Sequence, residues 1–146
     1  MNKIGKLIGI FLGSIALIII AVVIFLFSIF GQGMCGNRIS KVVDSPDQKL
    51  KIVVFERDCG ATTDFSTQIS ILEKSRELQN ESGNIFSGDS DNGNAKINDL
   101  GLIYIEPKWI DNRTILIKYD SLAAVYTSKK VFKGIDIKYK KVKSGY

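Results

Sequence analysis

The chain begins with a long apolar run and then changes to a short-period alternation of apolar and polar residues. Residues 7–30 (LIGIFLGSIALIIIAVVIFLFSIF) contain no charged side chain over 24 positions. At about 1.5 Å per residue, a helix of this length reaches ~36 Å and covers the ~30 Å hydrocarbon layer of a bilayer. Beyond residue 38 the apolar residues recur with period two, which is typical of β-strands.

The alternating region predicts about seven short strands. Residues 50–57 carry apolar side chains on both faces, which predicts an interior strand packed on each side. Residues 65–71 alternate apolar or Thr positions with Ser and Gln, so one face of this strand is wet. The other predicted strands are 39–43, 102–105, 114–119, 123–126 and 135–139. This pattern predicts an all-β fold, a small antiparallel sandwich or open barrel preceded by one transmembrane helix.

Two segments between the strands differ in composition. Residues 73–81 are the only stretch of this region with helical potential, and two leucines alone would anchor so short a helix. Residues 82–98 (SGNIFSGDSDNGNAKIN) are rich in Gly, Ser, Asn and Asp and predict a long surface loop. A weak internal repeat, SPDQKLKIVVF and IDNRTILIKY at an offset of 64, predicts two hairpins in one domain.

The apolar run is interpreted as an uncleaved membrane anchor. A secretory signal peptide has a shorter apolar region of about 7–15 residues and a small-x-small cleavage site. The best candidate site here, Gly31-Gln32-Gly33, is poor, and Met34 argues against a lipid anchor on Cys35. The predicted organisation is a short cytoplasmic tail (1–6), a transmembrane helix (7–30), a spacer (31–38) and an extracytoplasmic β domain (39–146).

The cysteines decide the orientation, because the basic residues on the two sides of the apolar run are nearly balanced. Cys35 and Cys59 are the only two, and both follow the apolar run. Pairing them would close a loop of about 25 residues and contribute about 3 kcal/mol. Disulfides persist in oxidising compartments, so the pair favours a domain outside the cytosol. Two free thiols in a cytosolic domain are the alternative.

Small residues recur along the apolar run. Gly5, Gly9 and Gly13 are four residues apart and therefore share one face of a helix. This spacing lets two backbones approach closely in lipid, which predicts a helix–helix contact and a homodimer. Glycine is also common in isolated membrane helices, so a monomeric anchor is the alternative.

Catalytic groups are sparse. Histidine is absent, which excludes a Ser-His-Asp triad, a Cys-His dyad and imidazole metal ligands. Ser128 and Lys129 are adjacent and would point to opposite faces of a strand, so they cannot share a proton. The 15 carboxylates show no spacing that indicates a shared cleft. We therefore expect no catalytic residue, no enzymatic activity and no cofactor.

A cluster of oxygen-bearing side chains lies in the polar loop. Asp89, Asp91, Asn92, Asn94 and Asp99 are ligands of the kind that calcium prefers. Counted from Asp89, position six is asparagine rather than glycine, and position twelve is leucine rather than glutamate. We therefore expect a solvated turn that holds no metal.

Positive charge is concentrated toward the C-terminus. Residues 128–146 hold seven lysines and one acid, Asp136, whereas residues 31–127 hold 11 basic and 14 acidic residues. Alternation of these lysines with apolar residues first indicates an edge strand protected against pairing. Contact with anionic lipid headgroups is the second interpretation. Nucleic acid is not an expected partner, because Tyr139 and Tyr146 alone make a poor stacking platform.

Three consecutive charges end the predicted interior strand. Alternation places Glu56 and Asp58 on one face and Arg57 on the other. Arg57 would act either as an anion clamp beside the disulfide or as a cover for the edge of the core. If a surface site exists, we expect it in the polar cluster next to Cys59, formed by Arg57, Asp58, Thr62, Thr63 and Gln68.

The segment SPDQKLKIVVFERDCGATTDFSTQISIL (residues 45–72), with LQNESGNIF after it, resembles a family of small uncharacterised bacterial envelope proteins. These have an N-terminal membrane or lipid anchor and a segment of the form SPDGKY-x-VVFERDCGATT-x-FSTQ. Gln48 replaces the family's turn glycine, and the family's histidine near Asp91 is missing. The resemblance implies a bacterial envelope location and a role for Cys35 with Cys59, and it implies no activity.

These features predict a single-pass bacterial membrane protein with its N-terminus inside and a disulfide-linked β domain outside. The predicted function is binding or assembly at the cell envelope, with the lipid bilayer and another envelope protein as partners. An inhibitor or protective protein acting on an envelope enzyme or toxin is one alternative. A hydrolase with a carboxylate-based site is another, which a concave polar pocket with converging carboxylates would favour.

Overall fold

The computed structural model describes residues 2–30, 35–60 and 65–143, without the side chains of residues 27–30. The chain divides into two units, Met1–Met34 and Cys35–Tyr146, and each unit is considered by itself. The second unit begins four residues before the predicted domain start at residue 39. It does so because Cys35 is bonded to Cys59 and the first strand already begins at Gly36.

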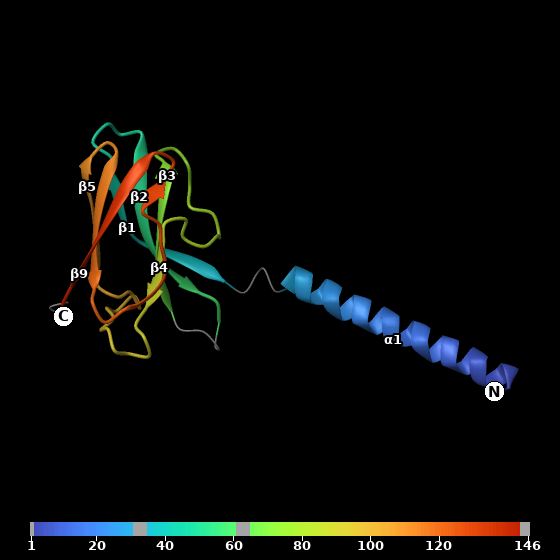
Figure 1. Cartoon of the computed structure of the whole chain (residues 1–146). Coiled ribbons are helices and arrows are strands. Elements are labelled where there is room, and N and C mark those ends of the chain that lie inside the picture. Colours follow the sequence, from blue (N-terminus) through green and yellow to red (C-terminus); the bar gives the residue numbers. More distant parts are fainter. Residues whose placement is uncertain (1, 31–34, 61–64, 144–146) are drawn as a thin grey trace. The chain divides into compact units, whose positions relative to one another are not determined.

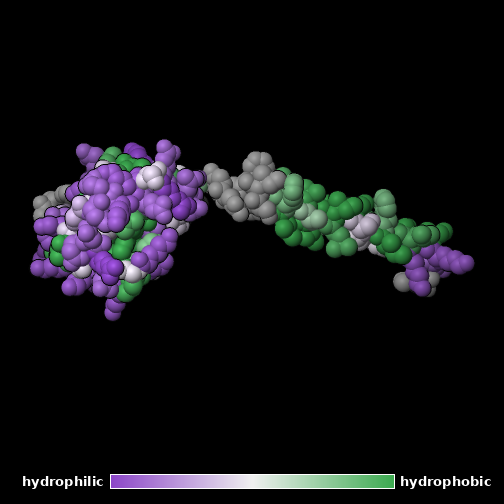
Figure 2. Space-filling view, turned by 90° about the horizontal axis from the view of Figure 1, so that it is seen from above, coloured by the Kyte–Doolittle hydropathy of each residue, from purple (hydrophilic) through white to green (hydrophobic). Residues whose placement is uncertain are grey.

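The first unit is one helix, α1 (Lys3–Phe30). It begins before the charge-free run, because Lys3 and Lys6 are good helix formers and extend the same hydrogen-bond ladder. Its section Lys3–Leu26 is long and apolar enough to cross a membrane, a property that signal sequences near an N-terminus share. The helix surface is apolar over most of its length and polar at its N-terminal end (Figure 2). Side chains added at Gly9 or Gly13 would meet nothing within 4 Å.

The second unit contains nine strands among its described residues, arranged in two sheets (Figure 1). The five-stranded sheet has the order β1-β2-β3-β4-β7, and the four-stranded sheet has the order β5-β6-β9-β8. The strands are β1 (Gly36–Asp44), β2 (Leu50–Asp58), β3 (Ser66–Glu73), β4 (Phe86–Asp89), β5 (Ile105–Asp111), β6 (Thr114–Asp120), β7 (Ala124–Ser128), β8 (Val131–Phe132) and β9 (Ile135–Val142). The predicted all-β fold is confirmed as a sandwich of two open sheets.

One pair of strands departs from the predicted antiparallel arrangement. Strands β6 and β9 are parallel, with Ile115 opposite Ile137. Parallel neighbours require a long connection. The chain supplies it by leaving β6, forming β7 in the other sheet and returning through β8. The sandwich is therefore mixed rather than purely antiparallel.

The hydrophobic core lies between the two sheets. Ile52 and Ile69 of the five-stranded sheet belong to the same buried cluster as Ile115 and Ile137 of the four-stranded sheet. Trp109 closes one end of this core, and its indole Nε1 donates a hydrogen bond to the carbonyl of Val43 at 3.0 Å. Period-two alternation produces this core, because every second side chain of each central strand faces the other sheet.

Tyr139, in the middle of β9, connects the two sheets. Its ring stacks on Phe86 with centroids 6.1 Å apart. Its hydroxyl has one proton, which it shares between the carbonyls of Ile85 and Lys129 at 3.1 and 3.0 Å. Burial raises the pKa of the Tyr139 hydroxyl, so it remains a neutral donor over the whole physiological range.

Two segments differ from the sequence prediction. Residues 73–81, where a short helix was predicted, contain no helix. Their backbone and side chains bond to the five-stranded sheet instead, and Leu78 is the only half-buried apolar residue among them. The loop predicted at residues 82–98 contains β4. This strand is FSGD, with one large apolar residue, so its sequence shows no alternation to detect.

The strand predicted at residues 102–105 begins later than expected. Leu102 and Ile103 are buried, but β5 starts only at Ile105 and continues through Trp109. Ile103 instead forms an isolated bridge with Ile97. The buried apolar residues Leu102 and Ile103 therefore precede the strand, and most of the paired strand lies beyond the predicted range.

The two repeated segments form two hairpins, as predicted. One hairpin is β1–β2 and the other is β5–β6, and they belong to different sheets. The two turns are in contact, because the backbone N–H of Asp47 donates to Asn112 Oδ1 at 3.0 Å. A hydrogen bond from the Ser45 hydroxyl lowers the pKa of Asp47. A hydrogen bond from the backbone N–H of Arg113 likewise lowers the pKa of Asp111. Both turns thus use an aspartate as a local acceptor.

Candidate functional site

The disulfide predicted between Cys35 and Cys59 is present, with an S–S distance of 2.05 Å. Its position follows from the hairpin, because Gly36 and Asp58 are opposite each other in the β1–β2 pair. The cysteines therefore flank the last paired residues and are brought together by strand pairing. The bond closes the end of the hairpin at which the described chain enters the β unit.

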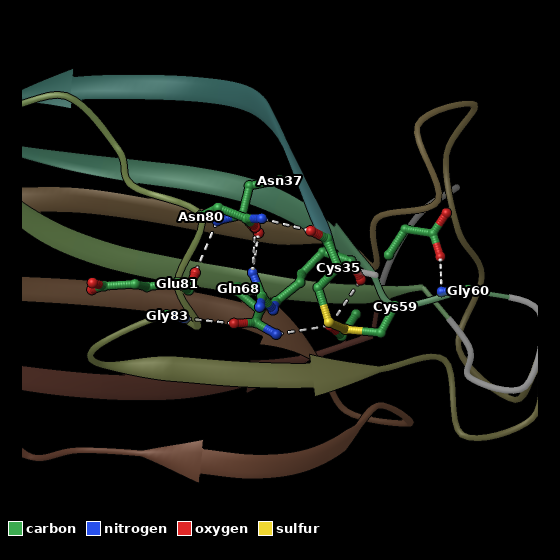
Figure 3. The surroundings of a disulfide bond; sticks show 11 residues. Cys35, Asn37, Cys59, Gly60, Gln68, Asn80, Glu81 and Gly83 are labelled. Carbon is green, nitrogen blue, oxygen red and sulfur yellow. Dashed lines mark hydrogen bonds between the residues drawn. A yellow bond between two sulfur atoms is a disulfide. The ribbon is translucent and has the colours of Figure 1, made fainter. Parts of the chain in front are cut away.

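Arg57 lies beside the disulfide and is bonded to two asparagines. Its Nη1 donates to Asn37 Oδ1 at 2.7 Å and to Asn80 Oδ1 at 3.1 Å. Asn37 in turn donates from Nδ2 to the carbonyls of Gln79 and Glu81 at 3.0 and 2.8 Å (Figure 3). The guanidinium therefore fastens residues 79–81 to the first two strands.

Asn80 completes the connection to the disulfide. Its Nδ2 donates to the carbonyl of Cys35 at 2.7 Å (Figure 3). Asn37 and Asn80 each accept from Arg57 through the side-chain oxygen and donate to backbone through the side-chain nitrogen. This use of both ends of an amide fixes its orientation.

Gln68 is buried on the same face of the sheet, two strands from the edge. Its Nε2 donates to Ser66 Oγ at 2.8 Å, and its Oε1 accepts from the Gly83 backbone N–H at 2.5 Å (Figure 3). A Cβ at Gly83 would lie 2.6 Å from the Phe86 carbonyl and 2.9 Å from that of Ile69. A glycine is therefore required where the chain passes over Gln68.

Residues 74–84 form a covering segment over the outer face of the five-stranded sheet, meaning the face turned away from the four-stranded sheet. Below this segment Val53 and Phe55 are 1% and 0% exposed, although neither belongs to the core between the sheets. Asn84 bonds to Ile71 through both its side-chain atoms, at 2.9 Å each. This segment explains why the predicted interior strand is packed on each side.

The predicted surface residues therefore occupy different environments. Arg57 and Gln68 are bonded to the covering segment and its neighbours. Asp58 is exposed, and it accepts the backbone N–H of Gly60 at 2.8 Å. Thr62 and Thr63 lie outside the described residues. The structure brings Arg57 and Gln68 to one face of the five-stranded sheet. Because Arg57 is bonded to Asn37 and Asn80, its role is closer to the predicted cover for the edge of the core than to the predicted anion clamp.

Glu56 is a buried carboxylate that the sequence analysis did not single out as a site residue. It is 4% exposed and accepts from the Arg38 guanidinium, with an Nη2–Oε2 distance of 2.6 Å. Arg38 also donates to the carbonyl of Leu100 at 3.1 Å. The strand alternation could have predicted the burial of Glu56, because it follows Ile52 and Val54 on the core-facing side of β2.

An open groove of about 450 Å³ lies at the end of β6. Its lining includes the buried Asp120 together with Lys96 and Lys143. Asp120 Oδ1 accepts the backbone N–H of Leu122 at 2.9 Å. One carboxylate between two lysines is not the converging pair of carboxylates that a carboxylate-based hydrolase needs.

The polar loop that contains Asp89 and Asp91 forms a hydrogen-bonded turn. Asp89 Oδ1 accepts the backbone N–H of Asp91 at 2.8 Å, and Asp91 Oδ2 accepts from Asn94 at 2.9 Å. Asp91 and Asn92 have positive φ angles of 51° and 55°, which both residue types tolerate. Within the described residues, no three acidic, cysteine or histidine side chains are grouped so as to hold a metal ion.

The fold and the site thus define a disulfide-closed mixed β sandwich that follows an apolar helix. Comparison with protein-family models, with curated proteins and with solved structures finds no match to this chain.

Proposed function

We propose that this chain is a single-pass membrane protein whose β domain lies outside the cytosol and acts as a binding or assembly module at the cell envelope. The observation that supports this proposal most is the Cys35–Cys59 disulfide directly after α1. A structural disulfide is kept in oxidising compartments, and α1 is long enough to hold the chain in a bilayer.

The connection between the two units is short. Four residues, 31–34, separate Phe30 from Cys35. An extended chain advances at most about 3.6 Å per residue, so this connection reaches no more than about 18 Å. If α1 spans a bilayer, the domain entered at Cys35 remains within reach of the surface of that bilayer. Binding would therefore take place at the membrane surface.

Binding is proposed rather than catalysis because the buried carboxylates have structural partners. Glu56 is paired with Arg38, and Asp120 accepts the N–H of Leu122. The chain contains no histidine to act as a base near neutral pH.

The proposal is tested by expressing the full chain in a bacterium and locating it. We expect alkaline carbonate to leave the chain in the membrane fraction, with an intact N-terminus by mass spectrometry. Spheroplasts treated with protease should lose the β domain, and a maleimide should react with the chain only after reduction. A chain recovered from the cytosol with two reactive thiols would refute the proposal. A chain cleaved after α1 would refute the anchor alone.

A further inference from the structure

The four-stranded sheet carries lysines across its outer face, the face turned away from the core. Strand register places Lys108 of β5 and Lys138 of β9 on either side of Leu116 of β6. In the next row, Lys118 of β6 is directly beside Lys140 of β9. We call Lys108, Lys118, Lys138 and Lys140 the lysine face.

These lysines are accessible. Lys108, Lys138 and Lys140 are exposed, and the Lys118 side chain is 39% exposed. Lys118 forms an ion pair with Glu106 at 3.1 Å. None of the other three forms an ion pair within 4 Å with any residue that the structure describes. Glu106 and Asp136 share this face, and Asp111 interacts electrostatically with Lys138. Four lysines against these two carboxylates leave the face with a net positive charge.

Protection of a sheet edge accounts for only part of this arrangement. Beyond Ile137, β9 has no described strand on its second side, so lysines there would discourage pairing with another chain. Lys118, however, is on a strand that is paired on both sides. Edge protection therefore does not account for Lys118, which forms a cross-strand ion pair with Glu106 of β5 and adds a positive charge beside Lys140.

The charge is also segregated along the chain. Residues 105–143 contain ten basic and four acidic residues, whereas residues 35–104 contain eight basic and eleven acidic residues. The first range provides every strand of the four-stranded sheet, and the second provides most of the five-stranded sheet. The part of the chain that forms the four-stranded sheet is therefore net positive, whereas the part that forms most of the five-stranded sheet is net negative.

The side chains around the lysines favour a lipid surface over a nucleic acid. Leu116 and Val131 are the apolar neighbours on the outer face. The aromatic residues of the same strands, Trp109, Tyr119 and Tyr139, pack toward the core. Single-stranded nucleic acids are bound through aromatic stacking as well as charge, whereas anionic headgroups attract lysines through charge alone.

We propose that the lysine face binds the anionic phospholipid headgroups of the bilayer that holds α1. This inference rests on the proposed function, because α1 and its short connection keep the domain near that bilayer. Each lysine near an anionic surface strengthens the association about five-fold. The positive face and the negative membrane surface are complementary in charge, and the domain would rest on the membrane through this face.

The experiment uses the full chain in nanodiscs of phosphatidylcholine alone or of three parts phosphatidylcholine to one part phosphatidylglycerol. An amine-acetylating reagent is added, and the modification rate of each lysine is read by mass spectrometry. We expect Lys108, Lys138 and Lys140 to react several-fold more slowly in the anionic nanodiscs. High salt should remove the difference, and Lys49 and Lys74 should react equally in both.

A matched pair of double variants sharpens the test. Lys138→Gln with Lys140→Gln should return Lys108 to its rate in phosphatidylcholine, since two removed charges weaken the association more than twenty-fold. The control, Lys49→Gln with Lys74→Gln, removes the same charge from the other part of the domain. It should leave Lys108 protected.

The contrary results are distinct. Equal rates in both nanodiscs, with the chain inserted, would overturn the lipid proposal and leave the proposed function standing. Failure of the chain to insert would overturn both. Protection by an added oligonucleotide in phosphatidylcholine nanodiscs, without protection by phosphatidylglycerol, would assign the face to nucleic acid instead.

Discussion

The outer faces of the two sheets are built by the same strand alternation, yet one is covered and the other is open. Val53 and Phe55 on the five-stranded sheet are buried below residues 74–84. On the four-stranded sheet, Lys108, Lys138 and Lys140 are exposed to solvent. The covered face is held by amide hydrogen bonds and closed at one end by a disulfide.

The difference separates stability from recognition. Burying apolar side chains on a second face adds hydrophobic stabilisation that the small inter-sheet core would not supply alone. Lysines without an ion pair contribute no comparable stabilisation to the folded state, but they remain available to an external partner. We therefore expect changes to the covered face to affect unfolding and changes to the open face to affect binding.

The largest effect is expected from Phe55→Ala. Phe55 is completely buried below the covering segment, and removing such a side chain costs about 3–5 kcal/mol. Urea unfolding of the full chain in mild detergent measures this loss. The chain has a single tryptophan, Trp109, which is buried and whose fluorescence reports the unfolding of the β domain.

Two valines provide a matched comparison of the faces. Val53→Ala, at a site 1% exposed, should lower the free energy of unfolding by about 2 kcal/mol. Val131→Ala, at a site 58% exposed, should change it by less than about 0.5 kcal/mol. Equal losses for the two variants would show that the covering segment does not protect its face.

Removal of the disulfide is expected to have an effect larger than that of Val53→Ala and second only to that of Phe55→Ala. The bond closes a loop with a sequence separation of 24, and losing it should cost about 3 kcal/mol. The double variant Cys35→Ala with Cys59→Ala and the reduced wild-type chain should unfold at similar urea concentrations. A reductant should not shift the variant further. An unchanged midpoint after verified reduction of the wild type would contradict this expectation.

Gly83→Ala should destabilise the covered face by about 1–3 kcal/mol, because the new methyl group would collide with two backbone carbonyls. Amide exchange at Val53 and Phe55 should accelerate as the covering segment lifts. Gly36→Ala is the control, since a Cβ there meets nothing within 4 Å. Similar unfolding curves for the two alanine variants would argue against a close passage over Gln68.

The smallest effect concerns the open face. Hydrogen bonds from Lys118, then from Tyr104, lower the pKa of Glu106 below its ordinary value of 4.5. A carboxyl with a lowered pKa stabilises the folded state above the unfolded pKa, and this contribution disappears as the pH falls through the folded pKa. Glu106→Gln should therefore be slightly less stable than wild type near pH 7. The difference should shrink below pH 4.5, and a constant difference would assign it to another cause.

The strands could be predicted wherever alternation was long and clear. β2, β3, β6 and β9 each repeat apolar residues at every second position, and all four were predicted. β4 and β8 were missed because four and two residues are too few to show a period. Their pairing is decided by neighbouring strands, which a single segment does not reveal.

The candidate site was only partly predictable. The three charges at the end of β2 and the two cysteines drew attention to the correct end of the hairpin. Asn37, Asn80 and Gly83 carried no signal, because isolated asparagines and glycines are common in turns. Their role depends on the position of residues 79–84 over the sheet. For Asn37, the residues it contacts in this segment are more than 40 positions away in the sequence.

The order of residues alone determined the apolar helix, the all-β character of the remainder and the fact that Cys35 and Cys59 have only each other as a disulfide partner within the chain. Those properties depend on local periodicity, on composition and on there being only two thiols to join. The tertiary structure decided which faces are covered, which strands run parallel and which lysines stand side by side. These depend on where the chain goes after each strand, because side chains from distant segments become neighbours only when the sheets assemble.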